Sequence, residues 1–367
     1  MICRHAAKLG NLDHIKHHVN FESMSSQDIL FMQRALELAE NGRGTVSPNP
    51  MVGCVIVHDD KIIGEGWHIK YGEGHAEVNA INSVDDASLL SKSTCYVTLE
   101  PCAHHGRTPP CADLLIKVNI GKVVIGCIDQ NPLVGGKGVE KLKMAGIAVE
   151  TGLLEAECKR LNARFFTSIE ENRPYTILKW AQTKDGFVAR ENFDSKWISN
   201  EASRTLVHQW RAEEDAILVG FNTAKHDNPT LNVRDWNGKN PLRIVIDKSL
   251  DLKKELHLFD DSIPTLIYNV VKDQSDGDLE FVKVEEENFI ANLLKDLSRR
   301  GIRSLIVEGG SKVLNNFIEN NSWDEARVFS SSLKFGAGIK APYLGLKSTE
   351  VINVLNDKLE IYINEKD

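Results

Sequence analysis

Short apolar runs of strand length alternate with helical segments through the first part of this 367-residue chain, and this alternation limits the fold more than any other feature. Strand-like runs at 52–57, 94–99 and 122–127 are separated by segments such as 111–118, whose apolar residues recur at helical spacing. Such an alternation is typical of a mostly parallel sheet covered by helices on both faces. The sequence therefore predicts an α/β fold whose ligand crevice lies at the carboxyl ends of the strands.

A second α/β unit is predicted after the first. The segment 168–176 is polar and contains Pro174, which interrupts the alternation and indicates a linker. Because single domains usually hold roughly 100–200 residues, a chain of this length predicts two of them. We assign residues 24–167 to the first domain and residues 174–367 to the second, and we assign no function to an N-terminal extension, residues 1–23.

Composition limits the kinds of molecule that the protein could bind and the compartment in which it could work. A net charge of −8 argues against a nucleic-acid surface, and the longest apolar runs are too short to span a bilayer. The seven cysteines are an odd number scattered through a large chain, which favours reduced thiols and a metal over a disulfide framework. Residues 1–23 lack the apolar core of a secretory signal. We therefore expect a cytoplasmic protein, forming a homo-oligomer, with a small-molecule partner and neither a nucleic acid nor a membrane.

Three potential zinc ligands occur at the ends of predicted elements. His75 and Cys111 each begin a predicted helix, and Cys102 follows a strand. Helix N-termini stabilise thiolates, and a catalytic zinc takes three protein ligands and keeps its fourth position for water. Glu77, two residues after the histidine, is placed to move a proton between the attacking water and a leaving amine. This set predicts a deaminase site.

The cysteine spacing departs from the usual deaminase signature, H-x-E followed by P-C-x-x-C. Eight residues, AHHGRTPP, separate Cys102 from Cys111 where that signature has two. Two alternatives therefore stay open on spacing alone. The cysteines could be core thiols, or His104 or His105 could close a structural zinc site.

A second candidate site lies at LIVEGGSKVLNNF, residues 305–317. This stretch predicts a strand, a Gly-Gly turn and a helix with Ser311 as its N-cap. Backbone N–H groups at a helix start bind anions, and glycine lets a phosphate approach the backbone. The G-x-G-x-x-G fingerprint is absent, so a nicotinamide cofactor would need a different fold.

Several segments share their sequence and their order with one known family. They are SPNPMVGCVIV, HAEVNA and LEPCAHHGRTPPC in the first half, and ILKWAQTKDGFVA, SKWIS, VGFNTAKHDNPTLNVR and VEGGSKVLNNF in the second. In these segments the chain resembles the bifunctional deaminase/reductase family of riboflavin biosynthesis, in which the eight-residue spacer is characteristic. The resemblance covers nearly everything after Met24. It implies a cytidine-deaminase-like three-layer α/β/α domain followed by a dihydrofolate-reductase-like α/β domain.

The resemblance also implies two reactions and their site residues. The deaminase, with Zn²⁺, replaces the 2-amino group of 2,5-diamino-6-(5-phosphoribosylamino)pyrimidin-4(3H)-one with oxygen, and Asn49 contacts the pyrimidine. The reductase, with NADPH, then converts the ribosyl side chain to ribityl, which gives 5-amino-6-(5-phosphoribitylamino)uracil. The NADPH site is implied to be lined by Ala181, Trp197, Thr223, Asp227, Gly310, Ser311, Lys312, Val313, Leu314, Asn315 and Asn316. The substrate is implied to face Ser195, Arg211, Leu231, Arg234 and Glu308, of which the arginines suit a phosphate.

Two departures from the family pattern affect individual reductase contacts. The chain reads TKDG at 183–186 where the family commonly has Ser-Leu-Asp-Gly, and Asp227-Asn228 where it often has two aspartates. Asp227 is the one acid–base candidate for the reduction. Two rival interpretations remain: a deaminase of cytosine, guanine or tRNA adenine whose second half only dimerises or binds substrate, and a non-catalytic zinc-stabilised binding module. NADPH oxidation with the deaminated intermediate would separate the first rival from the bifunctional enzyme.

Overall fold

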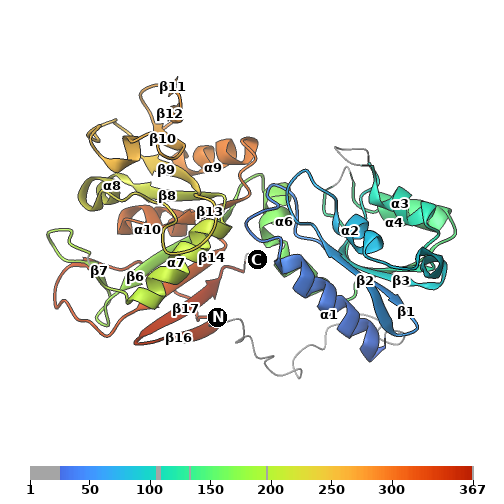
Figure 1. Cartoon of the computed structure of the whole chain (residues 1–367). Coiled ribbons are helices and arrows are strands. Elements are labelled where there is room, and N and C mark those ends of the chain that lie inside the picture. The colour runs from blue at the N-terminus through green and yellow to red at the C-terminus, as the bar shows by residue number, and fades with distance from the viewer. Residues whose placement is uncertain (1–24, 105–108, 132–133, 196, 366–367) are drawn as a thin grey trace.

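The computed structural model describes residues 25–104, 109–131, 134–195 and 197–365. Two sheets lie side by side, each flanked by helices, and helix α6 lies in the junction between them (Figure 1). Within the described residues, no helix combines the length and the apolar character needed to cross a membrane.

The first sheet belongs to the N-terminal part of the chain. Its strands are β1 (Gly53–His58), β2 (Lys61–Trp67), β3 (Thr94–Leu99), β4 (Lys122–Cys127) and β5 (Ala148–Thr151). Its helices are α1 (Ser26–Glu40), α2 (Ala76–Asn82), the 3-10 helix η2 (Ala87–Lys92), α3 (Cys111–Lys117), α4 (Lys137–Met144), α5 (Glu155–Leu161) and α6 (Ala163–Glu170). Helix α1 begins where Ser25 and Asp28 form a reciprocal capping box.

Alternating side chains of this sheet form two apolar cores. On β1, Cys54 and Ile56 pack on one face with α2, α3 and α4, whereas Val55 and Val57 pack on the other with α1, α5 and α6. Strand periodicity of two puts successive residues on opposite faces, so a run that is apolar throughout is buried on both sides. The three-layer α/β/α arrangement implied by the resemblance is thus confirmed.

The strand pairing is mixed, which corrects the expectation of a mostly parallel first sheet. The order is β2-β1-β3-β4-β5; β1 is antiparallel to both β2 and β3, and only β3, β4 and β5 run parallel. Strand β2 follows β1 through a tight turn that contains Asp59 and Asp60, both with positive φ. A hairpin at this position makes its two strands antiparallel.

The second sheet has the order β11-β12-β10-β9-β8-β13-β6-β14-β17-β16. Its strands are β6 (Tyr175–Gln182), β8 (Ala216–Gly220), β9 (Leu242–Ile246), β10 (Thr265–Asn269), β11 (Gln274–Asp276), β12 (Leu279–Lys283), β13 (Ser304–Val307), β14 (Glu325–Ser330), β16 (Glu350–Val354) and β17 (Asp357–Ile363). A separate pair joins β7 (Phe187–Ala189) to β15 (Ile339–Lys340). The run from β12 through β14 is parallel, and the strands outside it are antiparallel.

Helices cover both faces of the second sheet as well. They are α7 (Glu201–Glu213), α8 (Phe221–Asp227), the 3-10 helix η3 (His257–Phe259), α9 (Phe289–Arg299) and α10 (Ser311–Glu319). Residues of α9 and α10 pack in one apolar core, and residues of α7 and α8 pack in the other.

The connection between the two halves is shorter and more ordered than the linker predicted at 168–176. Helix α6 extends to Glu170, and β6 begins at Tyr175. Between them Arg173 is buried and makes two hydrogen bonds of 2.5 and 2.6 Å to the carboxylate of Asp324. A buried arginine is stable only when it is paired, so this contact fixes the connection to the second sheet.

Candidate functional sites

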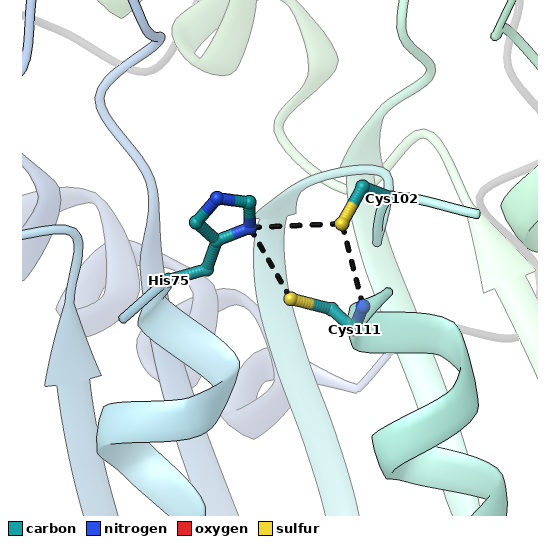
Figure 2. Close-up of side chains that lie close together, drawn as sticks. All are labelled: His75, Cys102 and Cys111. Atoms are coloured by element: carbon teal, nitrogen blue, oxygen red, sulfur yellow. Dashed lines mark hydrogen bonds between the residues drawn. The ribbon is translucent and has the colours of Figure 1, made fainter. Parts of the chain in front are cut away.

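Three side chains converge at one edge of the first sheet. His75 is the N-cap of α2, Cys111 is the first residue of α3, and Cys102 lies in the loop after β3. The Nδ1 atom of His75 is 3.3 Å from the Cys111 sulfur and 3.6 Å from the Cys102 sulfur (Figure 2). All three ligand atoms lie within 4.8 Å of one another. Tetrahedral zinc would hold such atoms about 3.5–3.8 Å apart, so the cluster fits this metal with little movement.

The two thiols differ in acidity. Hydrogen bonds from the Cys111 side chain, the His75 ring and the Cys111 backbone N–H lower the pKa of Cys102 to about 4. The hydrogen bond with Cys102 and burial together raise the pKa of Cys111. One thiolate therefore forms readily, whereas a second thiolate needs a cation beside it. A divalent metal supplies that charge, because a coordinating thiol is deprotonated.

Glu77 is buried in the first turn of α2 beside this cluster, with 3% of its surface exposed. Burial, and then the negative charge of Cys102, raise its pKa to about 7. Glu77 is not one of the three clustered ligands. A carboxyl group with a pKa near neutrality both accepts and releases protons, as general acid–base catalysis requires.

The structure weakens the alternative of a closed structural zinc site. Over the described ranges, the group able to hold a metal contains His75, Cys102 and Cys111 but not His104. His105, the other candidate for the fourth ligand, lies outside the described residues. Among the described residues the group has three potential ligands, which is the number that a catalytic zinc takes from the protein.

Asn49 reaches the cluster through a histidine that sequence reasoning missed. Its Nδ2 lies 3.3 Å from Nε2 of His68, and Nδ1 of His68 lies 3.2 Å from the carbonyl oxygen of Gly74. The His68 and His75 rings are 5.3 Å apart in an edge-to-face arrangement. The predicted pyrimidine contact is therefore one side chain away from a predicted zinc ligand. Burial lowers the pKa of His68, which favours the neutral ring.

A cavity of about 1230 Å³ opens in the second half at the carboxyl ends of β6, β8, β9 and β13. Ligands of open α/β sheets bind at this edge. Every reductase residue named from the sequence lines the cavity: Ala181, Ser195, Trp197, Arg211, Thr223, Asp227, Leu231, Arg234, Glu308, Gly310, Ser311, Lys312, Val313, Leu314, Asn315 and Asn316. The structure thus gathers residues that span more than a hundred positions of sequence.

The N-cap of the helix after the Gly-Gly turn lies one residue earlier than predicted. Gly310, with φ +73°, is the N-cap of α10, and Ser311 is its first helical residue and not the cap. The Ser311 hydroxyl instead donates a hydrogen bond of 2.9 Å to the carbonyl of Lys340. A Cβ at Gly309 would lie 3.0 Å from the Thr223 hydroxyl, so this turn also packs tightly on α8. Glycine leaves the N–H groups of the helix start accessible to an anion.

Glu308 is the centre of an ion-pair network in the cavity wall. Arg211 donates to its two oxygens at 2.7 and 2.9 Å, and Lys179 donates at 3.4 Å. Burial raises the pKa of Glu308, but Arg211 and Lys179 together outweigh burial and lower that pKa to about 2. The Nε and Nη2 edge of the Arg211 guanidinium is therefore occupied by this carboxylate, and Arg234, half exposed, is the more accessible cation. Sequence reasoning missed Lys179, whose one signal was a charge inside an apolar strand.

Asp227 ends helix α8 at the cavity wall. The Ser195 hydroxyl lies 3.4 Å from both of its carboxylate oxygens. Asn228, the next residue, adopts φ +43° and accepts a hydrogen bond from the backbone N–H of His257. Asparagine tolerates this left-handed conformation well. Asn228, which stands where the family often has a second aspartate, therefore has a structural role.

Comparison with known proteins gives a consistent result for both halves. The family described as the cytidine and deoxycytidylate deaminase zinc-binding region matches residues 25–127, and the family described as the RibD C-terminal domain matches residues 174–360. The riboflavin biosynthesis protein RibD of Aquifex aeolicus is 41% identical over 326 residues, which cover 87% of this chain and 91% of the relative. The Escherichia coli protein of that name is 35% identical and covers 85% of this chain and 89% of its own length.

Solved structures extend the likeness to the whole fold. The crystal structure of a diaminohydroxyphosphoribosylaminopyrimidine deaminase/5-amino-6-(5-phosphoribosylamino)uracil reductase from Thermotoga maritima superposes with a TM-score of 0.84 at 37% identity. It covers 91% of this chain and 98% of its own. Acinetobacter baumannii RibD gives a TM-score of 0.83 at 34% identity and covers 93% of this chain and 99% of its own.

Proposed function

Because this chain belongs to the RibD family, which joins a zinc-binding deaminase domain to a reductase domain, we propose how its own residues divide the two reactions. The protein is a bifunctional deaminase and reductase of riboflavin biosynthesis, with Zn²⁺ and NADPH as cofactors. The first reaction is the hydrolytic deamination of 2,5-diamino-6-(5-phosphoribosylamino)pyrimidin-4(3H)-one. The second reduces the ribosyl side chain and gives 5-amino-6-(5-phosphoribitylamino)uracil.

In the deaminase half, His75, Cys102 and Cys111 hold the metal. When bound, Zn²⁺ supplies the Lewis acidity that activates water. Glu77 accepts the proton of the attacking water and delivers it to the leaving amine; this role is supported by its burial and its position beside the ligands. Asn49 orients the pyrimidine. Its contact with His68 supports a place for the pyrimidine ring next to the metal.

In the reductase half, the cavity holds NADPH and the ribosylamino substrate together. NADPH supplies the hydride. The start of α10, from Gly310 to Asn316, binds a phosphate of the cofactor, with Ala181, Trp197, Thr223 and Asp227 completing that part of the wall. Ser195, Leu231, Arg234 and Glu308 face the substrate. Arg234 binds the substrate phosphate, whereas Arg211 holds Glu308 in place.

One observation carries this proposal: a three-ligand metal cluster with a buried carboxyl group and a large glycine-turn cavity occur in the same chain. The test supplies the diamino substrate to the zinc-loaded protein and follows ammonia release and NADPH oxidation separately. We expect ammonia first, and NADPH oxidation only once deaminated product has formed. Ammonia release without any NADPH oxidation, even when the deaminated intermediate is supplied, would favour the single-activity deaminase.

We propose that residues 24–167 and 174–367 are the two catalytic domains. We also propose that the protein acts in the cytoplasm, because two thiolate ligands are best preserved in a reducing compartment. We further expect a homo-oligomer. Limited proteolysis, cell fractionation and analytical ultracentrifugation test these three proposals.

A further inference from the structure

One loop of the deaminase half contacts the reductase half directly. Between α1 and β1, the Ser47 hydroxyl donates a hydrogen bond of 2.8 Å to Oδ2 of Asp215, a residue 168 positions later. Gly44 of the same loop has φ +75°, and a Cβ there would lie 2.8 Å from the carbonyl oxygen of Ala212. The loop therefore packs against the end of α7 at a distance that only glycine permits.

Asp215 is a fixed acceptor. It lies between α7 and β8, and the same Oδ2 atom accepts hydrogen bonds from the backbone N–H groups of Arg303, at 2.7 Å, and Ser304, at 3.2 Å. In return, the Asp215 backbone N–H donates to the Ser304 hydroxyl at 2.9 Å. The backbone of the reductase half thus orients the carboxylate independently of Ser47. An acceptor that is fixed in this way restricts the position of its donor, the Ser47 hydroxyl.

The other end of the loop is anchored within the deaminase half. Both the N–H and the carbonyl of Met51 are hydrogen-bonded, at 2.8 Å each, to the side chain of buried Asn162. Asn49 lies between the two anchors, and its own N–H donates to the carbonyl of Val46 at 2.9 Å. The position of the Asn49 side chain beside His68 therefore depends on both anchors, one of which the reductase half provides.

We propose that Asp215, a residue of the reductase half, is a positioning residue for the deaminase reaction, because it holds Ser47 and thereby the loop that presents Asn49 to the pyrimidine. This inference rests on the proposed role of Asn49. The deaminase substrate site is then complete only when the reductase half is packed against it.

The test uses the full-length, zinc-loaded protein and measures KM and kcat for deamination. Ser47→Ala removes the donor and leaves Asp215 bound to its backbone partners. We expect KM to rise by about ten- to a hundredfold, the size expected for the loss of one hydrogen bond to a charged group. We expect kcat within about twofold of the parent, with zinc content and reductase activity unchanged, because neither cofactor site is touched.

Ser168→Ala is the matched control. Ser168 accepts a 2.6 Å hydrogen bond from Arg303, so this variant also removes one serine hydroxyl from a contact between the halves but does not touch the loop. Its KM should stay within about twofold of the parent. Asp215→Asn retains an acceptor oxygen and should behave nearly as the parent, whereas Asp215→Ala should raise KM as Ser47→Ala does, and the double variant should be no worse than either.

Asn49→Ala separates this inference from the proposed function. If Asn49→Ala raises KM and Ser47→Ala does not, the positioning role of Asp215 is overturned and the substrate site stands. If Asn49→Ala leaves KM unchanged, the proposed role of Asn49 fails and the inference fails with it. An equal rise in Ser47→Ala and Ser168→Ala would show general loosening between the halves and would also overturn the inference.

Discussion

Cys102 and Glu77 have different proposed roles in deamination. Cys102 belongs to the group of three side chains that could hold a metal, whereas Glu77 is buried beside this group without joining it. Removing one ligand of three should cost metal affinity. Removing the proton-transfer group should cost rate alone, since three ligands remain. Substitutions of these two residues therefore separate metal binding from proton transfer.

We predict that Glu77→Gln keeps a zinc content near that of the parent while the deamination rate falls by a factor on the order of 10² or more, because glutamine has the shape of the acid but its amide cannot act as a general base or acid. Cys102→Ser, in contrast, should lose both zinc and deamination. Metal analysis together with ammonia release checks both variants. Loss of zinc from Glu77→Gln would make Glu77 a ligand and contradict the assignment.

The sequence was informative about residues that belong to a recognisable motif. His75, Cys102 and Cys111 could be found because a histidine and two cysteines at element ends have a recognisable order. His68 and Lys179 could not, because neither belongs to a recognisable motif that includes its partner, Asn49 or Glu308. Nothing near either residue in the sequence specifies those partners, which depend on how the strands are placed.

At the scale of secondary structure elements, α10 connects the glycine turn to cofactor binding. Gly310 begins this helix with a positive φ, and the helix dipole and free N–H groups at that end favour an anion. We predict that Gly310→Asp weakens NADPH binding by about tenfold or more and leaves deamination unchanged, because a carboxylate at the helix start repels the cofactor phosphate. Titration of NADPH by fluorescence measures the effect.

Gly310→Asn is the matched control for that variant. It introduces a side chain of the same shape into the same strained backbone, but it carries no charge. The Asn variant should therefore bind NADPH more tightly than the Asp variant. If the two variants bind equally, strain and not charge accounts for the loss. Unchanged NADPH binding in Gly310→Asp would remove α10 from the proposed cofactor site.

Individual elements were easier to predict than their arrangement. The strands β1, β3 and β4 are largely apolar runs, α3 begins at Cys111 as expected, and α2 begins at Ala76 with His75 as its N-cap, one residue from the expected start. The antiparallel pairing of β1 with β3 was missed, because strand order is a long-range property. The connection after α6 was also misjudged: its polar residues indicated a solvated linker, but the buried Arg173 is polar because it pairs with Asp324.

At the scale of the whole molecule, a buried ion pair joins the two halves. Arg164 of α6 donates to both oxygens of Glu214, at 2.8 Å for its Nε, and the Glu214 side chain is fully buried. We predict that Arg164→Met lowers the free energy of unfolding by about 3 kcal/mol, because the buried Glu214 carboxylate loses its bidentate partner and keeps the more distant Arg327, at 3.9 Å. Urea denaturation measures the change. Lys159→Met, which breaks an exposed pair with Glu155, should cost no more than about 0.5 kcal/mol.

The same pair predicts a pH dependence. Burial raises the pKa of Glu214, but Arg164, together with Arg327 and Ser304, outweighs burial and lowers this pKa from 4.5 to about 2. A carboxylate with a depressed pKa stabilises the folded state fully above its ordinary pKa, and this stability is lost as the pH falls through the folded-state value. The difference in stability between the parent and Arg164→Met should therefore be largest above pH 4.5 and narrow toward pH 2. A constant difference across this range would contradict the role of the ion pair.

The two catalytic sites should still work independently once the halves are packed together. In the described part of the chain, the zinc cluster and the large cavity have no residue in common. We predict that removal of zinc by a chelator abolishes deamination, whereas NADPH-dependent reduction of the supplied deaminated intermediate stays within about twofold of the parent. Added Zn²⁺ should restore deamination, and circular dichroism should show that the metal-free protein remains folded.

The contact of Ser47 with Asp215 links the two halves, so the expected independence of reduction from zinc is a demanding test. Through that contact the reductase half positions a deaminase loop, but the Asp215 carboxylate is held by backbone N–H groups of its own half, so loosening the loop leaves the acceptor in place. The deaminase site should accordingly depend on the reductase half, whereas the reductase site should not depend on the deaminase half. If zinc removal stops reduction in a protein that is still folded, the coupling is mutual, and the two reactions share more structure than this single hydrogen-bonded loop provides.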